Sequence, residues 1–398
     1  MSILLIELES LKGHHISSYL RSIVKVLSIK KKKIFFLTTK EIKKSTFYRF
    51  YKKNTKIIYA PKIEYPKKKT NFNFLIFQIK NYILIKNIFK KIYIKYKIDH
   101  VYLNTLDFFD KPISIFGSPF ENIKFSGLFL NPKFNINHNF NNINNLKKTL
   151  YEKLFLKMLK FKNLEKVFFV DPITFYYLKK KKLKYKNKIT FIEDIGTANP
   201  INKISLTKIK CKKILNIKKN NYVVLLYGSI RENKSINELL EAYNSMKNKE
   251  NVTILIAGLQ DNDAKEVLNR SSLKKNYFRD NFIFINKFIN DKLEKIVFKA
   301  ADITWVGYSK NFFGSTGVLF LSSQNFTPVI GSNHGALGWY LKKYKIGFAE
   351  DLTKTKKIIN IFEQHMYKKR KFNFNFKKAN KNRNFENFGK KIFNNLII

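Results

Sequence analysis

The segment YGSIRENKSINELLEAY, residues 227–243, places two cations between an apolar run and a helical pattern. Gly228 ends the apolar run, and Arg231 and Lys234 follow in the turn before the helix. The free N–H groups and the dipole of a helix N-terminus favour an anion, and the two side chains add charge-assisted hydrogen bonds. The segment is therefore typical of a phosphate-binding loop, and a solvated turn is the alternative in a lysine-rich chain.

A second loop follows the same logic. The stretch FFGSTGVLFL, residues 312–321, carries four small residues directly before a helical pattern: Gly314, Ser315, Thr316 and Gly317. Small residues let backbone amides approach a ligand closely, and a hydroxyl can cap the helix. Two such loops in one domain fit a diphosphate held between them. The Walker pattern G-x-x-x-x-G-K-[ST] is absent, so this nucleotide-diphosphate site would use another kind of cradle.

These loops need a scaffold that brings them together. The second half has five strand-like runs, each followed by a helical pattern: 221–228, 251–258, 281–288, 302–308 and 327–331. The first half has six further candidates: 3–8, 33–39, 99–104, 124–130, 166–171 and 189–196. Strand–helix alternation predicts parallel sheets with helices on both faces, and ligands then lie at the carboxyl ends of the strands. Residues 40–97 receive no assignment.

We therefore expect an α/β protein built of two Rossmann-like domains whose parallel sheets face a cleft. The predicted boundaries are 1–198 for an N-terminal, acceptor-side domain and 199–370 for a nucleotide-binding domain. Residues 371–398 would form a helical tail that packs back on the N-terminal domain. Ser235 and Glu238 have the S-x-x-E spacing of a capping box, which predicts the start of the helix after the first loop.

A lysine-rich, solvated surface accounts for the high positive charge of the chain. Of 78 basic residues 7 are arginines, so 78 − 7 leaves 71 lysines, and the net charge is +50. Nucleic-acid readers depend on the bidentate arginine fork, and lysines spread along the whole chain fit a solvated surface better. We expect no specific nucleic-acid partner. An anionic membrane surface stays open as a partner, because basic faces interleaved with Phe and Tyr can dock on lipid.

The sequence lacks the residues that disulfide, metal-dependent or nucleophilic hydrolase chemistry would need. The single cysteine, Cys211, permits neither a disulfide framework nor a zinc cluster and fits a reducing compartment. The histidines are scattered apart from His14 and His15, and no carboxylate cluster suits Mg²⁺, so no metal site is expected. A G-x-S-x-G elbow is absent. The start reads as a strand and not as a signal peptide, and no apolar run reaches the roughly 20 residues that span a bilayer.

From about residue 220 to 348 the chain resembles the GT-B glycosyltransferases of family 4, the group 1 type. Gly228, Arg231 and Lys234 match the family's strand end and basic pair, which grips the donor diphosphate. Ala257 and Gly258 match the AG after the next strand, and 314–347 is similar to the donor loop, helix, PVI strand and turn of the family. The resemblance implies a nucleotide-sugar as co-substrate and no other cofactor.

The resemblance is thinner in the first half. Family members often have a glycine-rich turn after the first strand, next to the acceptor, and LKGHHISSYL, residues 11–20, sits there. Gly13, His14 and His15 would then line the acceptor side. A structural role, in which one histidine caps the helix, is an equal alternative.

One departure from the family concerns two glutamates that are separated by seven residues around the donor loop. Counting back from Pro328, the matching positions hold Phe313 and Leu321, which cannot accept a hydrogen bond from a sugar hydroxyl. Either backbone groups position the donor, or the donor differs, or catalysis is lost.

The resemblance implies a cytoplasmic transferase that moves a hexose-like sugar to a glycan or lipid-linked acceptor in cell-surface polysaccharide synthesis. Arg231 and Lys234 would stabilise the departing diphosphate without a metal ion. Retention of the anomeric configuration is implied by the family alone, and the enzyme could be peripheral on the inner face of a membrane. The alternatives are a catalytically silent GT-B-like binding protein and a basic nucleic-acid-binding protein.

Overall fold

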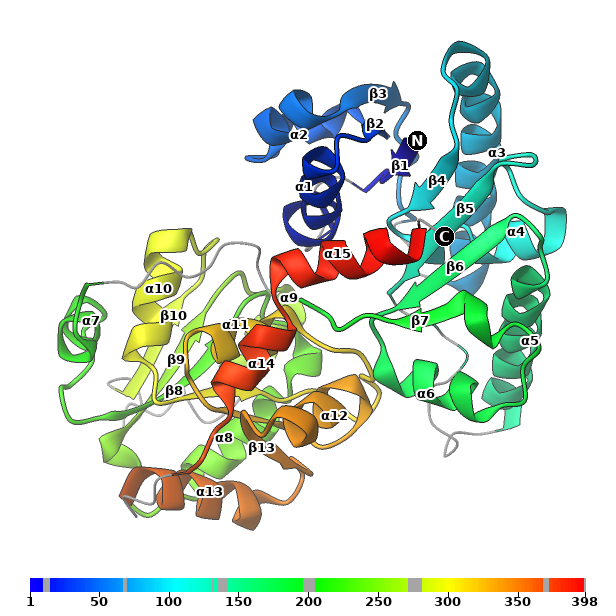
Figure 1. Cartoon of the computed structure of the whole chain (residues 1–398). Coiled ribbons are helices and arrows are strands. Elements are labelled where there is room, and N and C mark those ends of the chain that lie inside the picture. The colour runs from blue at the N-terminus through cyan, green and yellow to red at the C-terminus, as the bar shows by residue number, and fades with distance from the viewer. Residues whose placement is uncertain are drawn as a thin grey trace. The chain divides into compact units, whose positions relative to one another are not determined.

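The computed structural model of the chain describes residues 1–9, 15–66, 70–130, 132, 134, 142–195, 205–270, 281–367 and 372–396. Contacts divide the chain into two compact units (Figure 1). The first unit contains Met1–Ala198 together with Arg383–Ile398, and the second contains Asn199–Asn382. The predicted tail 371–398 is thus divided between the two units.

The first unit is built on a parallel sheet in the order β3-β2-β1-β4-β5-β6-β7, seven strands among the described residues. Its strands are β1 (Ser2–Ile6), β2 (Lys33–Thr39), β3 (Lys56–Ala60), β4 (His100–Leu103), β5 (Lys124–Phe129), β6 (Leu164–Phe169) and β7 (Ile189–Phe191). Its helices include α1 (Arg21–Ile29), α2 (Tyr48–Asn54), α3 (Asn71–Lys95), α4 (Asp110–Phe116), α5 (Asn142–Leu159), α6 (Pro172–Lys180) and α15 (Phe385–Leu396).

The second unit repeats this plan with a parallel sheet in the order β10-β9-β8-β11-β12-β13. Its described strands are β8 (Tyr222–Tyr227), β9 (Val252–Ala257), β10 (Phe282–Ile285), β11 (Ile303–Val306), β12 (Val329–Ser332) and β13 (Gly347–Glu350). Its helices include α7 (Lys208–Ile214), α8 (Ile236–Asn244), α9 (Asn262–Arg270), α10 (Asp291–Ala300), α11 (Gly317–Gln324), α12 (Gly335–Tyr344), α13 (Thr355–Tyr367) and α14 (Phe376–Asn382).

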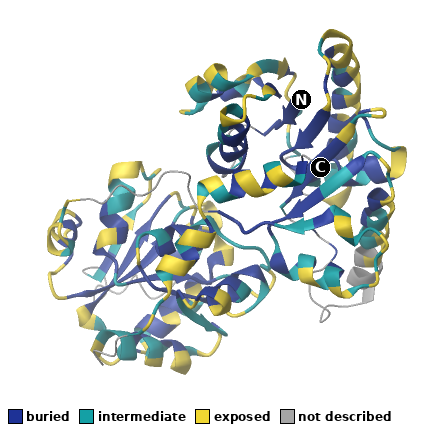
Figure 2. Ribbon diagram, viewed as in Figure 1, coloured by how far each residue is buried: buried dark blue, intermediate teal, exposed yellow. Residues whose placement is uncertain are grey.

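Both sheets are buried on both faces, which explains the near-continuous apolar strands (Figure 2). Along β1, Ile3 and Leu5 contribute to one core cluster, and Leu4 and Ile6 contribute to the cluster on the opposite face. In each unit the strand order reverses direction beside the first strand, between β1 and β4 and between β8 and β11. Ligands of doubly wound sheets bind at the carboxyl ends of the strands at such a point.

The prediction of two Rossmann-like domains with parallel sheets is confirmed. All eleven predicted strands overlap a strand of the structure, and the unassigned stretch 40–97 contains α2, β3 and the long helix α3. The strand β13 was not predicted. The cleft between the domains stays a prediction.

The C-terminal helix α15 packs on α1, within the first unit. Phe388, Ile392 and Leu396 join the core cluster that contains the apolar face of α1. The two helices approach so closely that a Cβ on Gly389 would lie 2.5 Å from the carbonyl oxygen of Ser22. The preceding helix, α14, belongs to the second unit, where the amide side chain of Asn380 bonds Ser323 of α11.

Candidate functional site

The turn after β8 is organised by Gly228. Its backbone is left-handed, with φ of 92°, and its N–H donates to the carbonyl of Ala257 at 3.0 Å. A Cβ at this position would lie 3.4 Å from Cγ2 of Val318 and 3.6 Å from Nζ of Lys234. Gly228 therefore lies where the basic loop meets the start of α11, the two places that the sequence assigns to a diphosphate.

Gly258, which follows β9, packs against the turn after β8. Its φ is 141°, and a Cβ here would lie 1.8 Å from the carbonyl oxygen of Gly228. No side chain fits between the two backbones. Gly258, directly after β9, thus lies against the turn after β8, and this packing explains the glycine of the AG dipeptide.

Lys234 is buried beneath the basic loop, with 7% of its surface exposed. Its Nζ donates to the carbonyl of Tyr227 at 2.5 Å and lies 5.9 Å from the ring centroid of Tyr308. Burial, followed by the nearby charge of Arg231, lowers the pKa of Lys234 to about 7. An ammonium in this state gains strongly from an added anion.

Arg231 is the exposed member of the pair. Its Nε donates to Oγ of Ser229 at 3.3 Å, and its carbonyl accepts the N–H of Lys234 at 3.0 Å. The side chain retains N–H donors that a phosphate could use, since a guanidinium has five. The basic pair therefore consists of the exposed guanidinium of Arg231 and the buried amine of Lys234.

The predicted capping box is wrong. Ser235 has a left-handed backbone, with φ of 48°, and makes no side-chain cap bond to α8. The reason is the short 3-10 turn Glu232–Lys234, which directs the chain into α8 from an angle that the capping geometry does not allow. The helix after the first loop is present as α8, which ends at Asn244.

The strand β11 and the turn that follows it, which leads to the second loop, are bound to the first loop by hydrogen bonds. The N–H of Ser309 donates to the carbonyl of Asn233 at 2.9 Å, and the indole N–H of Trp305 donates to the carbonyl of Lys234 at 3.1 Å. Both residues follow or belong to β11, the neighbour of β8. The first loop and the turn after β11 therefore form a single assembly at the point where the strand order reverses.

Tyr308 connects this assembly to the start of α11. Its hydroxyl donates to Oγ1 of Thr316 at 3.1 Å, and its ring stacks on Phe312 with centroids 3.9 Å apart. Thr316 in turn accepts the N–H of Val318 at 3.3 Å and so caps α11. The sequence reasoning overlooked Tyr308, whose signal was its position at the carboxyl end of the predicted strand 302–308.

Phe313 and Leu321, at the usual glutamate positions, have packing roles. Leu321 is buried against the β8 side of the core. The carbonyl of Phe313 accepts the N–H of Ala336 at 2.8 Å, and its ring contacts His334 edge-on with centroids 5.9 Å apart. Gly335 is needed here because a Cβ would lie 2.6 Å from the carbonyl oxygen of Phe313.

In the first unit, His15 lies at the carboxyl end of β1 beside a buried carboxylate. Its Nδ1 is 3.3 Å from Oε2 of Glu7, which also accepts hydrogen bonds from Asn104 and Thr105 at 2.7 Å each. Burial opposes both charges, yet the attraction between them raises the pKa of His15 and lowers the pKa of Glu7. The other two predicted acceptor-side residues, Gly13 and His14, lie outside the described residues.

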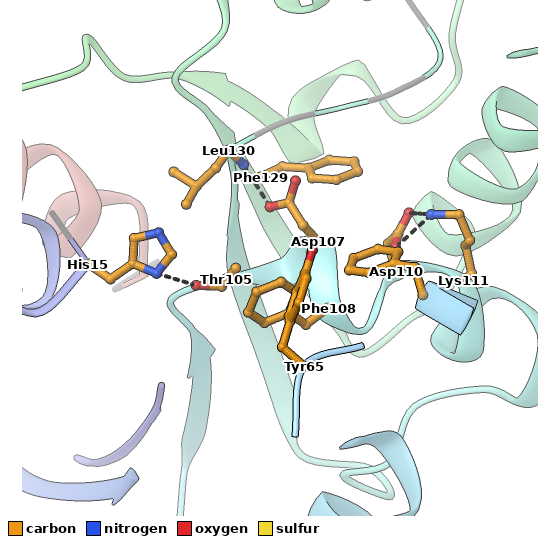
Figure 3. A pocket seen from close by; sticks show the side chains of 10 residues that line it. His15, Tyr65, Thr105, Asp107, Phe108, Asp110, Lys111, Phe129 and Leu130 are labelled. Carbon is orange, nitrogen blue, oxygen red and sulfur yellow. Dashed lines mark hydrogen bonds and ion pairs between the residues drawn. The ribbon is translucent and has the colours of Figure 1, made fainter. Parts of the chain in front are cut away.

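His15 also lines a pocket of about 230 Å³ in the first unit (Figure 3). The pocket combines aromatic walls with hydrogen-bonding groups: Tyr65, Phe74, Thr105, Asp107, Phe108, Asp110, Lys111, Phe129 and Leu130 complete its lining. Asp107 accepts the N–H of Leu130 at 2.8 Å. Asp110 accepts from Gln78 at 2.8 Å, and burial raises its pKa although Lys111 and Gln78 oppose the shift.

Sequence reasoning found His15 but missed the other polar residues of this pocket. Their signal was available, because Thr105, Asp107 and Asp110 follow the predicted strand 99–104 at its carboxyl end. Among the described residues no cluster of three His, Cys, Asp or Glu side chains could hold a metal ion. The described helices also include none with the length and apolarity to cross a membrane.

Comparison with solved structures identifies the fold. A glycosyltransferase from Rickettsia africae is similar over 99% of this chain and 97% of its own, with a TM-score of 0.66 and 18% identity. Anabaena HepE in complex with UDP and glucose is similar over 100% of this chain and 99% of its own, with a TM-score of 0.69 and 13% identity. Sucrose-phosphate synthase from Thermosynechococcus elongatus is similar over 99% of this chain and 98% of its own, with a TM-score of 0.71 and 15% identity. The fold is thus that of the GT-B class.

The family model of glycosyl transferases group 1 matches residues 207–383. This match covers almost all of the second unit, where the order of motifs in the sequence resembles the group 1 type. No curated protein matches the chain.

Proposed function

We propose that the chain transfers a sugar from a nucleoside-diphosphate sugar to a glycan or lipid-linked acceptor. The observation that carries this proposal is the meeting of Lys234, Gly228 and the start of α11 at the reversal of strand order in a group 1 domain. Anabaena HepE, which shares the fold, holds UDP and glucose in its structure. UDP-sugars are accordingly the first donors to test.

In the proposed reaction, negative charge grows on the diphosphate as the bond to the sugar breaks. Arg231 would bind it from the surface, Lys234 from below, and the backbone N–H groups of 314–317 from the start of α11. Preorganised donors aimed at developing charge commonly contribute the largest part of catalysis. We propose that these groups act without a metal ion or a further cofactor, and that the reaction retains configuration, as the group 1 likeness implies.

The pocket of the first unit is the proposed acceptor side. Its aromatic rings can stack on the apolar face of a sugar ring. A ring N–H of His15 can donate a hydrogen bond to a sugar hydroxyl, and the carboxylate of Asp107 can accept one from a sugar hydroxyl. We propose that the reaction takes place in the cytoplasm and contributes to cell-surface polysaccharide synthesis. The single cysteine fits a reducing compartment, and the proposed nucleotide-activated donor fits the same setting.

The test is donor hydrolysis and transfer with a panel of nucleotide sugars, followed by variants of the basic pair. Arg231→Ala and Lys234→Ala should each lower kcat by about 100-fold or more. Lys247→Ala, at an exposed lysine of the same unit, should leave turnover unchanged. Full activity in both site variants would refute the assignment. The anomeric configuration of the product, read by NMR, tests retention.

A second candidate function is a silent GT-B-like binding protein, which the packing of Phe313 and Leu321 at the usual glutamate positions favours. Calorimetry separates the two. Binding of nucleotide sugars without turnover of any of them would support the silent protein, and turnover would exclude it.

A further inference from the structure

The long helix α3 presents a second surface that the proposed reaction does not use. Its inner face is buried against the first sheet through residues that include Phe77, Tyr82, Ile85, Phe89 and Ile92. Its outer face is exposed along the rim of the first unit (Figures 1 and 2). The helix covers 25 residues and so is about 38 Å long at 1.5 Å per residue.

The outer face of α3 carries large apolar side chains in a line. Phe72, Ile76, Ile83 and Ile94 are exposed by 70, 36, 51 and 87%. Their separations of four, seven and eleven residues are near multiples of a helical turn, so the four side chains share one stripe. Each other element of the described chain carries at most two exposed large apolar residues. A stripe of this kind is a feature of interaction surfaces.

The end of α4 extends this stripe sideways. Ile115 and Phe116 are exposed by 46 and 57%, and the ring of Phe116 lies 5.8 Å from the ring of Tyr82 on α3. The extension belongs to the same unit and adjoins the middle of α3. The apolar side chains therefore form a ridge that is broader than one helix.

The charged side chains of α3 have one sign. The helix carries five exposed lysines, Lys80, Lys86, Lys90, Lys91 and Lys95. From residue 65 to residue 98 the sequence contains no aspartate or glutamate. The lysines of α3 therefore have no acidic partner on their own helix, and an anionic surface can supply the negative charge. Lysine stems can also lie along an apolar phase while the ammonium groups remain in the polar layer.

These features fit an extended anionic surface with an apolar layer beneath it. A helix with apolar residues on one stripe and lysines beside it lies in the headgroup region of an anionic bilayer. We propose that the outer face of α3, continued by Ile115 and Phe116, docks the chain on a membrane rich in anionic phospholipid. The helix lies parallel to the membrane plane. This inference goes beyond the proposed transfer reaction and needs no turnover for its test.

The experiment measures binding of the full chain to vesicles. Co-sedimentation with phosphatidylglycerol-rich vesicles should be strong, and with phosphatidylcholine vesicles weak. Because a net charge of +50 attracts anionic vesicles by itself, the decisive variant changes only the apolar stripe. The double variant Ile83→Asn and Ile94→Asn should weaken the apparent affinity by at least about tenfold, since two exposed aliphatic side chains no longer enter the lipid.

A matched control exists on α7 of the second unit. Ile209 and Ile214 are exposed by 52 and 53% and also stand among lysines. Their double change to Asn should leave vesicle binding unaltered. Equal loss in both double variants, or no loss in the α3 variant, would overturn the proposal. Circular dichroism confirms that each variant is folded.

A second readout reports insertion directly. The two native tryptophans, Trp305 and Trp339, lie in the second unit, so Phe72→Trp adds a probe on the ridge. Its fluorescence should shift to the blue on vesicle binding and be quenched by brominated lipid. An unshifted, unquenched signal with bound vesicles would show that charge alone holds the chain. Hydrolysis of a soluble nucleotide sugar should remain normal in the α3 variant, so failure of docking and failure of the transferase proposal are distinguishable.

Discussion

The Nζ atom of Lys234 lies 2.5 Å from the carbonyl oxygen of Tyr227, at the end of the central strand of the second sheet. This bond holds a buried amine directly under the turn at Gly228. Burial and the charge of Arg231 lower its pKa to about 7, so a proton is easily lost near neutral pH. The amine is thus sensitive to any anion that arrives in the turn.

The first prediction is proton uptake on donor binding. A diphosphate beside Lys234 raises the pKa of the amine, so UDP binding at about pH 8 should take up a proton. Calorimetry in two buffers of different ionisation enthalpy measures the number of protons taken up per bound UDP. Lys234→Gln should abolish the uptake, and Lys247→Gln should preserve it. Equal uptake in the Lys234 variant would contradict the proposed contact.

The second prediction concerns Tyr308, which bonds Oγ1 of Thr316 at 3.1 Å. Tyr308→Phe removes the donor and loosens the start of α11, where the diphosphate is proposed to bind. We expect a stability loss of about 1 kcal/mol and a severalfold rise in the KM of the donor, with a smaller effect on kcat. Tyr367→Phe, at a tyrosine that is 49% exposed, is the control. An unchanged KM would remove Tyr308 from the site.

The third prediction tests the contact between two turns. Gly258→Ala places a Cβ 1.8 Å from the carbonyl oxygen of Gly228, at a φ of 141°. We expect a loss of about 3 kcal/mol or more, because both backbones must move. Thermal unfolding measures it. Gly314→Ala, whose Cβ would meet only the Phe312 ring at 3.4 Å, should keep the melting temperature of the native chain.

The fourth prediction is a pH window for the pair of His15 and Glu7. The pKa of His15 is raised, so its contribution to stability is complete below the ordinary value of 6.5 and is lost as the pH rises through the folded value. The pKa of Glu7 is lowered, so its contribution is complete above 4.5 and is lost as the pH falls. The pair should therefore stabilise the fold most between these two values.

Glu7→Gln should accordingly cost about 2 kcal/mol in that window and less above the folded pKa of His15. Urea unfolding across the pH range checks this. Glu64→Gln is the control, because its side chain is 83% exposed. A cost for Glu7→Gln that stays constant with pH would show that the pair is not charged.

The main architecture could be predicted because buried parallel strands are apolar on both faces and end at turns. The runs 33–39 and 221–228 show this, and they became β2 and β8 almost unchanged. The strand β3 was missed because its short apolar run, residues 57–60, stands in a stretch rich in lysine and tyrosine that shows no clear pattern. The helix α3 was missed because the exposed apolar side chains of the ridge obscure its helical periodicity.

The candidate site was predictable in part. Gly228, Lys234 and Thr316 come together because adjacent parallel strands bring their following loops to one edge. The sequence could not show that Lys234 is buried while Arg231 is exposed, since both stand in one polar turn. Nor could it reveal that Glu7, Asn104 and Thr105 converge, because their pairing depends on the registration of β1 with β4.

The return of α15 to the first unit has a consequence for biosynthesis. The apolar surface of α1 is covered by Phe388, Ile392 and Leu396, which leave the ribosome only after the whole second unit. The first half of the nascent chain must therefore wait with an open hydrophobic face while the second sheet is translated. A product truncated before residue 383 would keep that face permanently uncovered and be a natural target for chaperones and proteases.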